Sequence, residues 1–423
     1  MSPDIGERRP ARDGIRHERA FLPPYTRCQP SVRSAERPPR PGVAPAASPP
    51  PRRAAAGAAI ARLGLAALAV AACARGPADR VATGGVTVEL LEGFDPSLDI
   101  RYDDVRSELV LESAAVDLPA HVTHHDVPRP PAQYGTIPID GWLHGYAVEL
   151  ADADGRPVPR VTLHHVNVIS PERRELFSGI MQRIGGAGHE TAAVDLPALI
   201  GYPVREGERL IMTVMLHNPT DTAYQGVRVR VRMPHSGPKR VIPPVEFFPF
   251  YLDVMPPASV HQYDVPPGGL HEKTWQGSPA VSGRLLGISG HLHDHGVAIR
   301  LEDLTTGKLL WEARPILNER GSVVGMPQNL FFKRLGIPIH RDHVYRVTAV
   351  YENTTDAVIE GAMAAVGGII AVRRSEAWPA VELTSDDFAL DLDLVRTGGD
   401  MMQAGAAPSR KTTAAPSGAH SHD

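Results

Sequence analysis

The chain has 423 residues, of which 42% are hydrophobic and 22% are charged, and its formal net charge at pH 7 is −4. A charge this close to zero gives no overall electrostatic attraction to nucleic acid, so we expect no nucleic-acid partner. The length suffices for two or three ordinary domains.

The first segment, residues 1–50, is rich in proline and arginine and has no hydrophobic period. This composition predicts a disordered segment, because such a sequence buries too little apolar surface to offset the entropy lost on folding. A translation start downstream of this segment is the alternative.

The next segment, residues 51–73, has the layout of an export signal. Arg52 and Arg53 precede a short apolar run, 63–72, which is too short for a membrane-spanning helix of about 20 residues. The run ends in "VAAC", which resembles a bacterial lipobox and implies that Cys73 carries a lipid that anchors the protein to a membrane. The alternative is a soluble export signal cut near the same place, which would give a periplasmic or extracellular protein.

Cysteine usage limits the chemistry of the remaining chain. The sequence contains Cys28 and Cys73 and no other cysteine. The chain after Cys73 therefore has no disulfide and no thiolate metal site of its own. A metal ion bound there must be held by His, Met, Asp or Glu.

From about residue 86 onward, short β-type segments alternate with turns. Residues 226–233 alternate Val with Arg, which predicts a strand with one buried face, and residues 148–169 and 297–313 each predict a hairpin. Residues 170–184 predict one short helix. The pattern predicts an all-β protein of two consecutive β-sandwich domains, at 86–245 and 246–395, with a low-complexity tail at 396–423.

Two histidine motifs lie in the predicted first domain. His164 and His165 are adjacent within a strand-like segment, so they share one metal ion only at a bulge or strand end. Otherwise one imidazole is buried and the other exposed. His217 stands before an Asn-Pro turn, where it is either a ligand or a cap of that turn. His144, in "GWLHGY", is predicted to be structural.

The second domain holds "GHLHDHG", in which His291, His293 and His295 alternate on one expected strand. Alternate residues of a strand point to the same face, so two of these imidazoles reach one ion unless the three form a solvated ladder. His295 is a third ligand, a neighbour of the ligands or a spectator. Met363 by itself predicts core filling, but a thioether is also a soft ligand suited to Cu(I).

The order HH, H, HxH and M along the chain resembles the copper type II, ascorbate-dependent monooxygenases, the family of peptidylglycine α-hydroxylating monooxygenase and dopamine β-monooxygenase. The resemblance implies two jelly-roll-like sandwiches with one copper ion each, two per chain. It implies an electron-donating site made by His164, His165 and His217. It also implies a catalytic oxygen-binding site made by His291, His293 and Met363. An ascorbate-like reductant and a small-molecule or peptide substrate of unknown identity would complete the reaction.

Three functions remain open from the sequence. The first is an exported copper monooxygenase that hydroxylates a C–H bond. The second is a non-catalytic copper-binding lipoprotein that stores, delivers or senses the metal. The third is a surface sandwich domain whose histidines fall together by coincidence.

Overall fold

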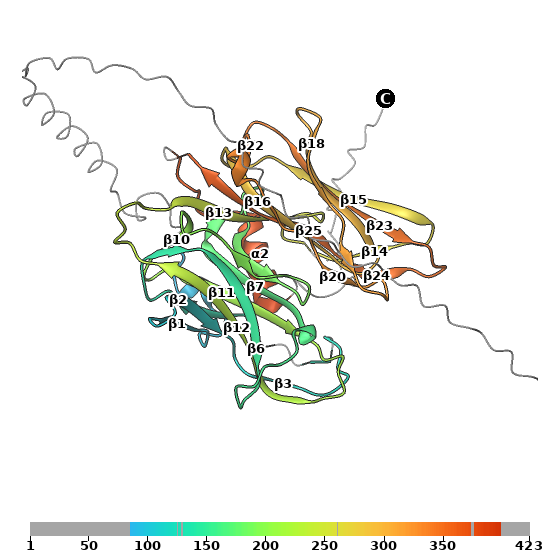
Figure 1. The fold of residues 1–423 in the computed structure, drawn as a ribbon, viewed down its shortest axis with the longest axis horizontal. Coiled ribbons are helices and arrows are strands. Elements are labelled where there is room, and N and C mark those ends of the chain that lie inside the picture. The colour runs from blue at the N-terminus through green and yellow to red at the C-terminus, as the bar shows by residue number, and fades with distance from the viewer. Residues whose placement is uncertain (1–84, 125, 128–129, 260, 374–375, 399–423) are drawn as a thin grey trace, which may run out of the picture. The chain divides into compact units, whose positions relative to one another are not determined.

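The computed structural model describes residues 85–398 except 125, 128–129, 260 and 374–375 (Figure 1). The described residues all belong to one compact unit, Leu68–Asp423. The expected disordered segment 1–50, the export segment 51–73 with Cys73, and residues 399–423 of the expected tail lie outside them. Among the described residues, no helix has the length and apolar character needed to cross a membrane.

The fold is an all-β sandwich, as the sequence predicts, and its strands follow one another with short connections (Figure 1). In the first half the strands are β1 (Asp99–Asp103), β2 (Glu108–Glu112), β3 (Val116–Leu118), β4 (Gln133–Thr136), β5 (Gly141–Leu143), β6 (Gly145–Ala151), β7 (Leu163–Arg174), β8 (Met181–Ala187), β9 (Val194–Asp195), β10 (Ile200–Val204), β11 (Arg209–Leu216) and β12 (Tyr224–Ser236). In the second half they are β13 (Val245–Asp253), β14 (Tyr263–Val265), β15 (Gly269–Gly277), β16 (Gly283–Leu292), β17 (Gly296–Asp303), β18 (Lys308–Ala313), β19 (Ile316–Leu317), β20 (Val323–Gly325), β21 (Asn329–Leu330), β22 (Ile337–Ile339), β23 (Tyr345–Asn353), β24 (Ile359–Ala362) and β25 (Ala364–Val372). The short 3-10 turns are η2 (Glu89–Leu91), η3 (Arg160–Thr162) and η4 (Phe332–Arg334), and an α-helix, α2 (Asp386–Thr397), follows the last strand.

One 13-stranded sheet passes through both halves, and nine of its strands follow one another in the order β1-β2-β12-β5-β10-β13-β25-β16-β21. The other four pair beside this path: β3 and β6 with β12, β9 with β6, and β22 with β16. The halves meet where β10 pairs in parallel with β13, through Ile200 opposite Val245 and Gly201 opposite Glu246. The boundary expected near residue 245 thus falls at the first residue of β13. Because backbone pairing crosses this boundary, the independence of the two expected domains stays a prediction.

Each half also has a four-stranded sheet, β4-β11-β7-β8 in the first and β15-β23-β17-β18 in the second. The buried valines of these sheets belong to the same apolar cluster as those of the large sheet, for example Val166 of β7 with Val229 of β12, and Val347 of β23 with Val366 of β25. Burial of such side chains on facing sheets is the main stabilising contribution in a sandwich.

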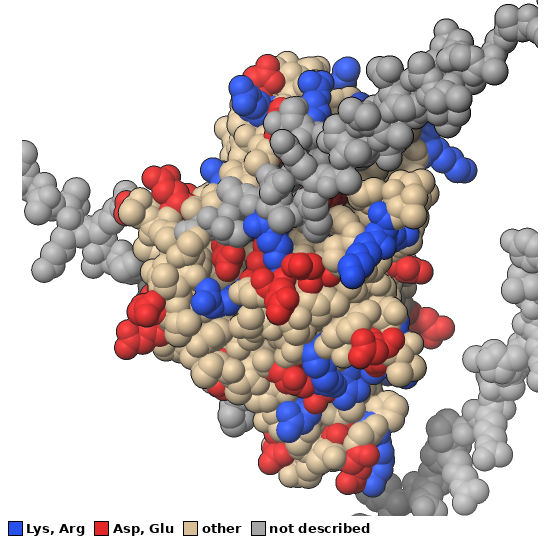
Figure 2. Space-filling view, turned by 90° about the vertical axis from the view of Figure 1, so that its left-hand side faces the viewer, with Lys and Arg blue, Asp and Glu red and all other residues tan. Residues whose placement is uncertain are grey.

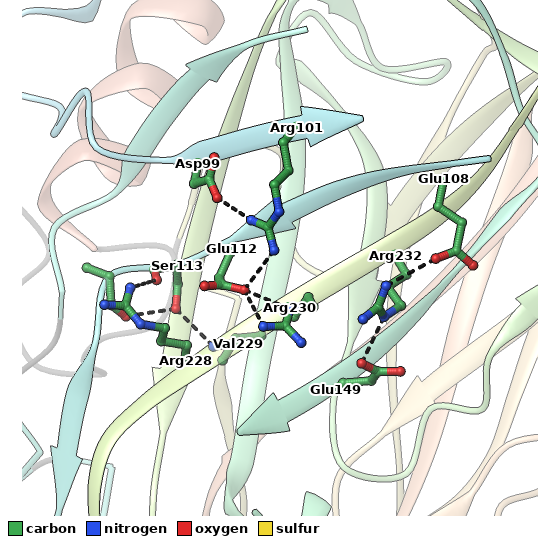
Figure 3. A network of polar contacts seen from close by, with 11 residues as sticks. Asp99, Arg101, Glu108, Glu112, Ser113, Glu149, Arg228, Val229, Arg230 and Arg232 are labelled. Carbon is green, nitrogen blue, oxygen red and sulfur yellow. Dashed lines mark hydrogen bonds and ion pairs between the residues drawn. The ribbon is translucent and has the colours of Figure 1, made fainter. Parts of the chain in front are cut away.

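The outer face of β12 carries the predicted arginines. Arg230 pairs with Glu112 at 2.6 Å, and Arg232 pairs with Glu149 at 2.9 Å and Glu108 at 3.2 Å (Figure 3). The intervening valines Val227, Val229 and Val231 are buried. The prediction of a strand with one buried face is therefore confirmed. Figure 2 shows that acidic and basic side chains are interspersed on the face that it views.

Two local expectations need correction. Residues 170–184 form no helix, because their buried side chains continue β7 and begin β8. At 148–169 the expected Asp-Gly turn is present, because the Asp152 amide donates to the Arg156 carbonyl at 3.0 Å and Ala151 bridges antiparallel to Pro157. The pairing does not extend further, since β6 pairs with β12 and β7 pairs with β11. Residues 297–313 do form the expected hairpin, in which β17 pairs with β18.

The helix α2 went unnoticed in the sequence. It begins after Ser385, whose side chain accepts a hydrogen bond from the Phe388 amide, and ends at Gly398, whose φ of 75° suits a residue without a side chain. Its buried side chains pack with Met181 of β8 in a second apolar cluster.

Candidate metal centre

A β-bulge in β7 explains how adjacent histidines reach one region. His165 is opposite Met215 of β11, but Leu163 is opposite Leu216, so His164 is the extra residue of the bulge. A bulge turns a side chain away from the regular alternation of a strand. The imidazoles of His164 and His165 consequently lie with their ring centroids 4.3 Å apart. The bulge that the sequence required for a shared ion is present, but the two imidazoles belong to different groups of histidines.

The second histidine pair lies where β16 ends. His291 is opposite Ala365 of β25, and His293 follows the last residue of β16. The amide of His293 donates to the hydroxyl of Tyr351 at 3.0 Å, and that hydroxyl donates to the carbonyl of Met363 at 2.5 Å. Tyr351 therefore fixes the end of β16 beside the link between β24 and β25.

The structure divides six histidines into two groups of three, each with ligand atoms within 4.8 Å of one another: His124, His164 and His217 form the first group, and His165, His291 and His293 form the second. The groups adjoin, since the ring centroids of His165 and His293 are 5.7 Å apart and those of His164 and His293 are 6.0 Å apart. The expected set differs in one respect: His165 lies with the histidines of the second half, and His124 takes its place.

Three of these imidazoles are each held in place by a hydrogen bond from one of their own ring nitrogens. His293 Nδ1 donates to the Gly361 carbonyl at 2.8 Å, and His217 Nε2 donates to the Val161 carbonyl at 2.6 Å. His291 Nδ1 donates to the Glu190 carboxylate at 2.8 Å. Fixing one nitrogen in this way sets the tautomer and turns the other nitrogen toward a ligand, as metal-binding histidines usually require.

In the second group, two ring nitrogens that make none of these hydrogen bonds are the strongest indication of a metal site. Nε2 of His291 and Nε2 of His293 are both buried, and neither has a hydrogen-bond partner. A buried polar atom without a partner costs free energy, on the order of 1–3 kcal/mol each. A metal ion bound between them, beside His165, would give both atoms a partner.

Four of these imidazoles, those of His164, His165, His217 and His293, are also kept neutral, the form that binds metals. Burial, followed by the neighbouring His124, lowers the pKa of His164 to about 2. Burial and the neighbouring His291 lower the pKa of His293 to about 4. Burial likewise lowers the pKa of His165, well below its usual value, and that of His217.

Glu190 is charged beside this group. Burial alone would raise its pKa, but the hydrogen bond from His291 and the attraction between the two groups outweigh burial and lower the pKa to about 2. Because Glu190 follows β8 and His291 belongs to β16, this bond also ties the two halves together.

A cavity of about 250 Å³ opens beside the second group, with His165, His291 and Met363 in its wall. Met363, which connects β24 to β25, therefore lies at the same cavity as two of the histidines. The largest parts of the remaining wall come from β8, β13, β16 and β25, and the wall is mainly apolar.

The other singled-out histidines lie outside both groups. His144 is buried, and its ring nitrogens contact the Ile200 carbonyl at 2.6 Å and the Ser236 hydroxyl at 2.8 Å, so its role is structural. His295 is exposed in the turn between β16 and β17, with a φ of 70°. The expected run of three histidines on one strand face thus ends at His293.

Two residues of the site were missed. His124 was visible in the sequence as the first residue of a second His-His pair, in "VTHHD". Glu190, in "GAGHET", gave no signal, because a single glutamate in a loop has no pattern that reveals a partner 101 residues away.

Comparisons with known proteins give no functional lead. No protein-family model matches the chain, and no curated protein matches it. Among solved structures, the infectious bursal disease virus Gx strain is 10% identical, covers 66% of this chain and 72% of its own, and has a TM-score of 0.17. The T=1 particle derived from infectious bursal virus is 12% identical, covers 65% and 67%, and also has a TM-score of 0.17. Scores this low carry no argument about function.

Proposed function

We propose that this chain is a copper-dependent, monooxygenase-like oxidoreductase in which the two histidine groups hold two copper ions side by side. The observation that carries the proposal is the pair of buried, unpartnered Nε2 atoms of His291 and His293 beside His165. If the chain were a surface domain whose histidines lie together by coincidence, nothing would explain why two such atoms lie close together.

The donor set fits copper. Imidazole binds copper well in either oxidation state, and a thioether favours the cuprous form. The first group offers imidazoles alone, and Met363 borders the cavity at the second. Imidazoles alone also suit zinc, so Met363 is the residue that favours a redox metal.

The adjacency of the groups changes the arrangement that the family resemblance implies. The resemblance implies a separate copper site in each sandwich, whereas the rings of His164 and His293 are here 6.0 Å apart. Ions held by these residues would accept electrons from an external, ascorbate-like reductant.

The protein's own groups would orient and shield the reaction. Glu190 and the Gly361 carbonyl hold the Nδ1 protons of His291 and His293, so that both rings keep a fixed direction. The mainly apolar cavity would place a bound molecule beside His165. Copper, when bound, supplies the one-electron chemistry with dioxygen that organic side chains lack.

The overall reaction balances as a hydroxylation. One oxygen atom of O2 enters a C–H bond of the substrate, and the other leaves as water. Two electrons from the reductant and two protons complete the equation. The chain would act outside the cytoplasm, anchored by a lipid on Cys73 or released after cleavage of its export signal.

Copper content and oxygen consumption test this proposal. We expect two copper ions per chain by elemental analysis and ascorbate-dependent oxygen uptake by the parent protein. His217→Ala should lose one ion, and Met363→Ala should slow oxygen uptake. His295→Ala is the matched control, because this exposed histidine lies outside both groups and should keep both ions.

Each contrary result has a distinct meaning. Two copper ions without oxygen uptake under any reductant would favour the copper-binding lipoprotein that stores, delivers or senses the metal. Less than one copper ion per chain, unchanged in His217→Ala, would overturn the proposal.

A further inference from the structure

The cavity beside the second histidine group carries information about the molecule that it receives. Its volume is about 250 Å³, slightly below the usual range of pockets for drug-sized ligands, which begins at about 300 Å³. Its position places any occupant against His165, His291 and Met363.

The wall of the cavity is dominated by apolar side chains and bare backbone. Leu143, Ile184 and Leu196 come from the first half of the chain, and Phe247, Phe250 and Ile369 come from the second. Such a wall stabilises an occupant by removing its apolar surface from water, at about 25 cal/mol per Å².

Charged groups at the cavity already have partners within the protein. Among the described residues that line it, Arg183 is the only Lys, Arg, Asp or Glu, and both of its terminal nitrogens bind Asp391, at 2.8 and 2.6 Å. His261 also lines the cavity and binds Asp253 at 2.9 Å. Neither side chain offers an unbalanced charge to a ligand.

The hydroxyl groups in the wall are occupied as well. The Tyr146 hydroxyl donates to the Gly186 carbonyl at 2.6 Å, and the Tyr251 hydroxyl donates to Asp253 at 2.6 Å. A carboxylate or ammonium ion entering this cavity would lose its water without gaining an opposite charge, which costs several kcal/mol.

We propose that the cavity binds a small, uncharged and mainly apolar compound, such as an alkyl or aryl molecule, and excludes organic acids and amines of the same size. That such a compound is the substrate rests on the proposed function. The binding preference itself rests on the cavity alone.

Three compounds that share a phenylbutyl group and differ in the charge of their end group test this preference: 4-phenylbutan-1-ol, 4-phenylbutyrate and 4-phenylbutylamine. Titration calorimetry on the metal-free protein should give a dissociation constant for the alcohol at least about tenfold below that of either ion. Equal or tighter binding of either ion would overturn the inference.

A substitution at Gly367 tests whether the alcohol binds in this cavity. It lines the cavity, and a Cβ built there meets nothing within 4 Å, so a larger side chain has room to enter the space. Gly367→Leu should weaken binding of the alcohol about tenfold or more while copper content stays that of the parent. Gly237→Leu is the matched control, because a Cβ there is equally free but lies outside the cavity, and it should bind as the parent does.

The same samples separate the two proposals. If the alcohol binds in the cavity but copper does not bind, the proposed function fails and the preference for neutral molecules stands. If copper binds and Gly367→Leu still binds the alcohol as tightly as the parent, the inference fails and the proposed function stands.

Discussion

The ion pair between Arg183 of β8 and Asp391 of α2 offers a direct test of how the cavity wall is held. The two side chains are 7% and 1% exposed, and they are joined by two hydrogen bonds, of 2.8 and 2.6 Å. Asp391 also accepts the Met181 amide at 2.9 Å. Asp391→Ala removes all three bonds at once from a buried position.

Breaking a buried ion pair by removing one partner typically costs about 3–5 kcal/mol. Glu175 also attracts Arg183, which compensates part of the loss, so we expect the lower end, about 3 kcal/mol. This is a large fraction of the 5–15 kcal/mol by which native domains are usually stable. Urea unfolding followed by tryptophan fluorescence and circular dichroism measures the difference.

Asp393→Ala is the matched control on the same helix. Asp393 pairs with Arg396 at 2.5 Å, but both side chains are about half exposed, so its loss should cost less than about 1 kcal/mol. If Asp391→Ala also cost less than about 1 kcal/mol, the helix would not be held to β8 by this pair and the reasoning would be wrong.

Three further predictions concern the site and its surroundings. His124→Ala should remove one copper ion and leave the other, as measured by elemental analysis; retention of both ions would contradict the grouping in the structure. Glu190→Gln should weaken copper binding about 10–100-fold in a competition titration with a chelator, because the carboxylate that orients His291 becomes a neutral amide, and unchanged affinity would exclude this role. Burial raises the pKa of Glu175 from 4.5 to about 7 despite hydrogen bonds from the amides of Tyr251 and Arg183. The folded state then holds a proton that the unfolded state has released, so the contribution of Glu175 to stability should fall by about 3 kcal/mol as pH rises from about 4.5 to 7. This contribution is measured as the difference in stability between the parent and Glu175→Gln at each pH, because the buried histidines titrate in both proteins. A parent protein whose stability follows the same pH curve as Glu175→Gln would show that the amides hold the carboxylate charged.

The sequence predicts the strands better than their partners. Alternating Val and Arg identify β12 because a period of two residues is a local property. The pairing of β6 and β7 with other strands depends on contacts far along the chain, so the hairpin expected over 148–169 is limited to the residues around its Asp-Gly turn. The helix α2 has only three buried side chains, too few for a clear apolar stripe.

The candidate site shows the same limit. The family resemblance implies His164, His165, His217, His291 and His293 as ligands, and the paired imidazoles among them are visible locally. Their division into groups depends on the bulge at His164 and on how β7 lies against the end of β16, which no spacing reveals.

The most direct test of the central claim is electron paramagnetic resonance of the full chain loaded with Cu(II), with copper measured on the same sample. Six imidazoles in two adjoining groups predict two copper ions per chain whose spectrum shows magnetic coupling between them. Two ions with uncoupled spectra would place the sites far apart, and a single ion would leave one histidine group without a metal. Either result would contradict the account.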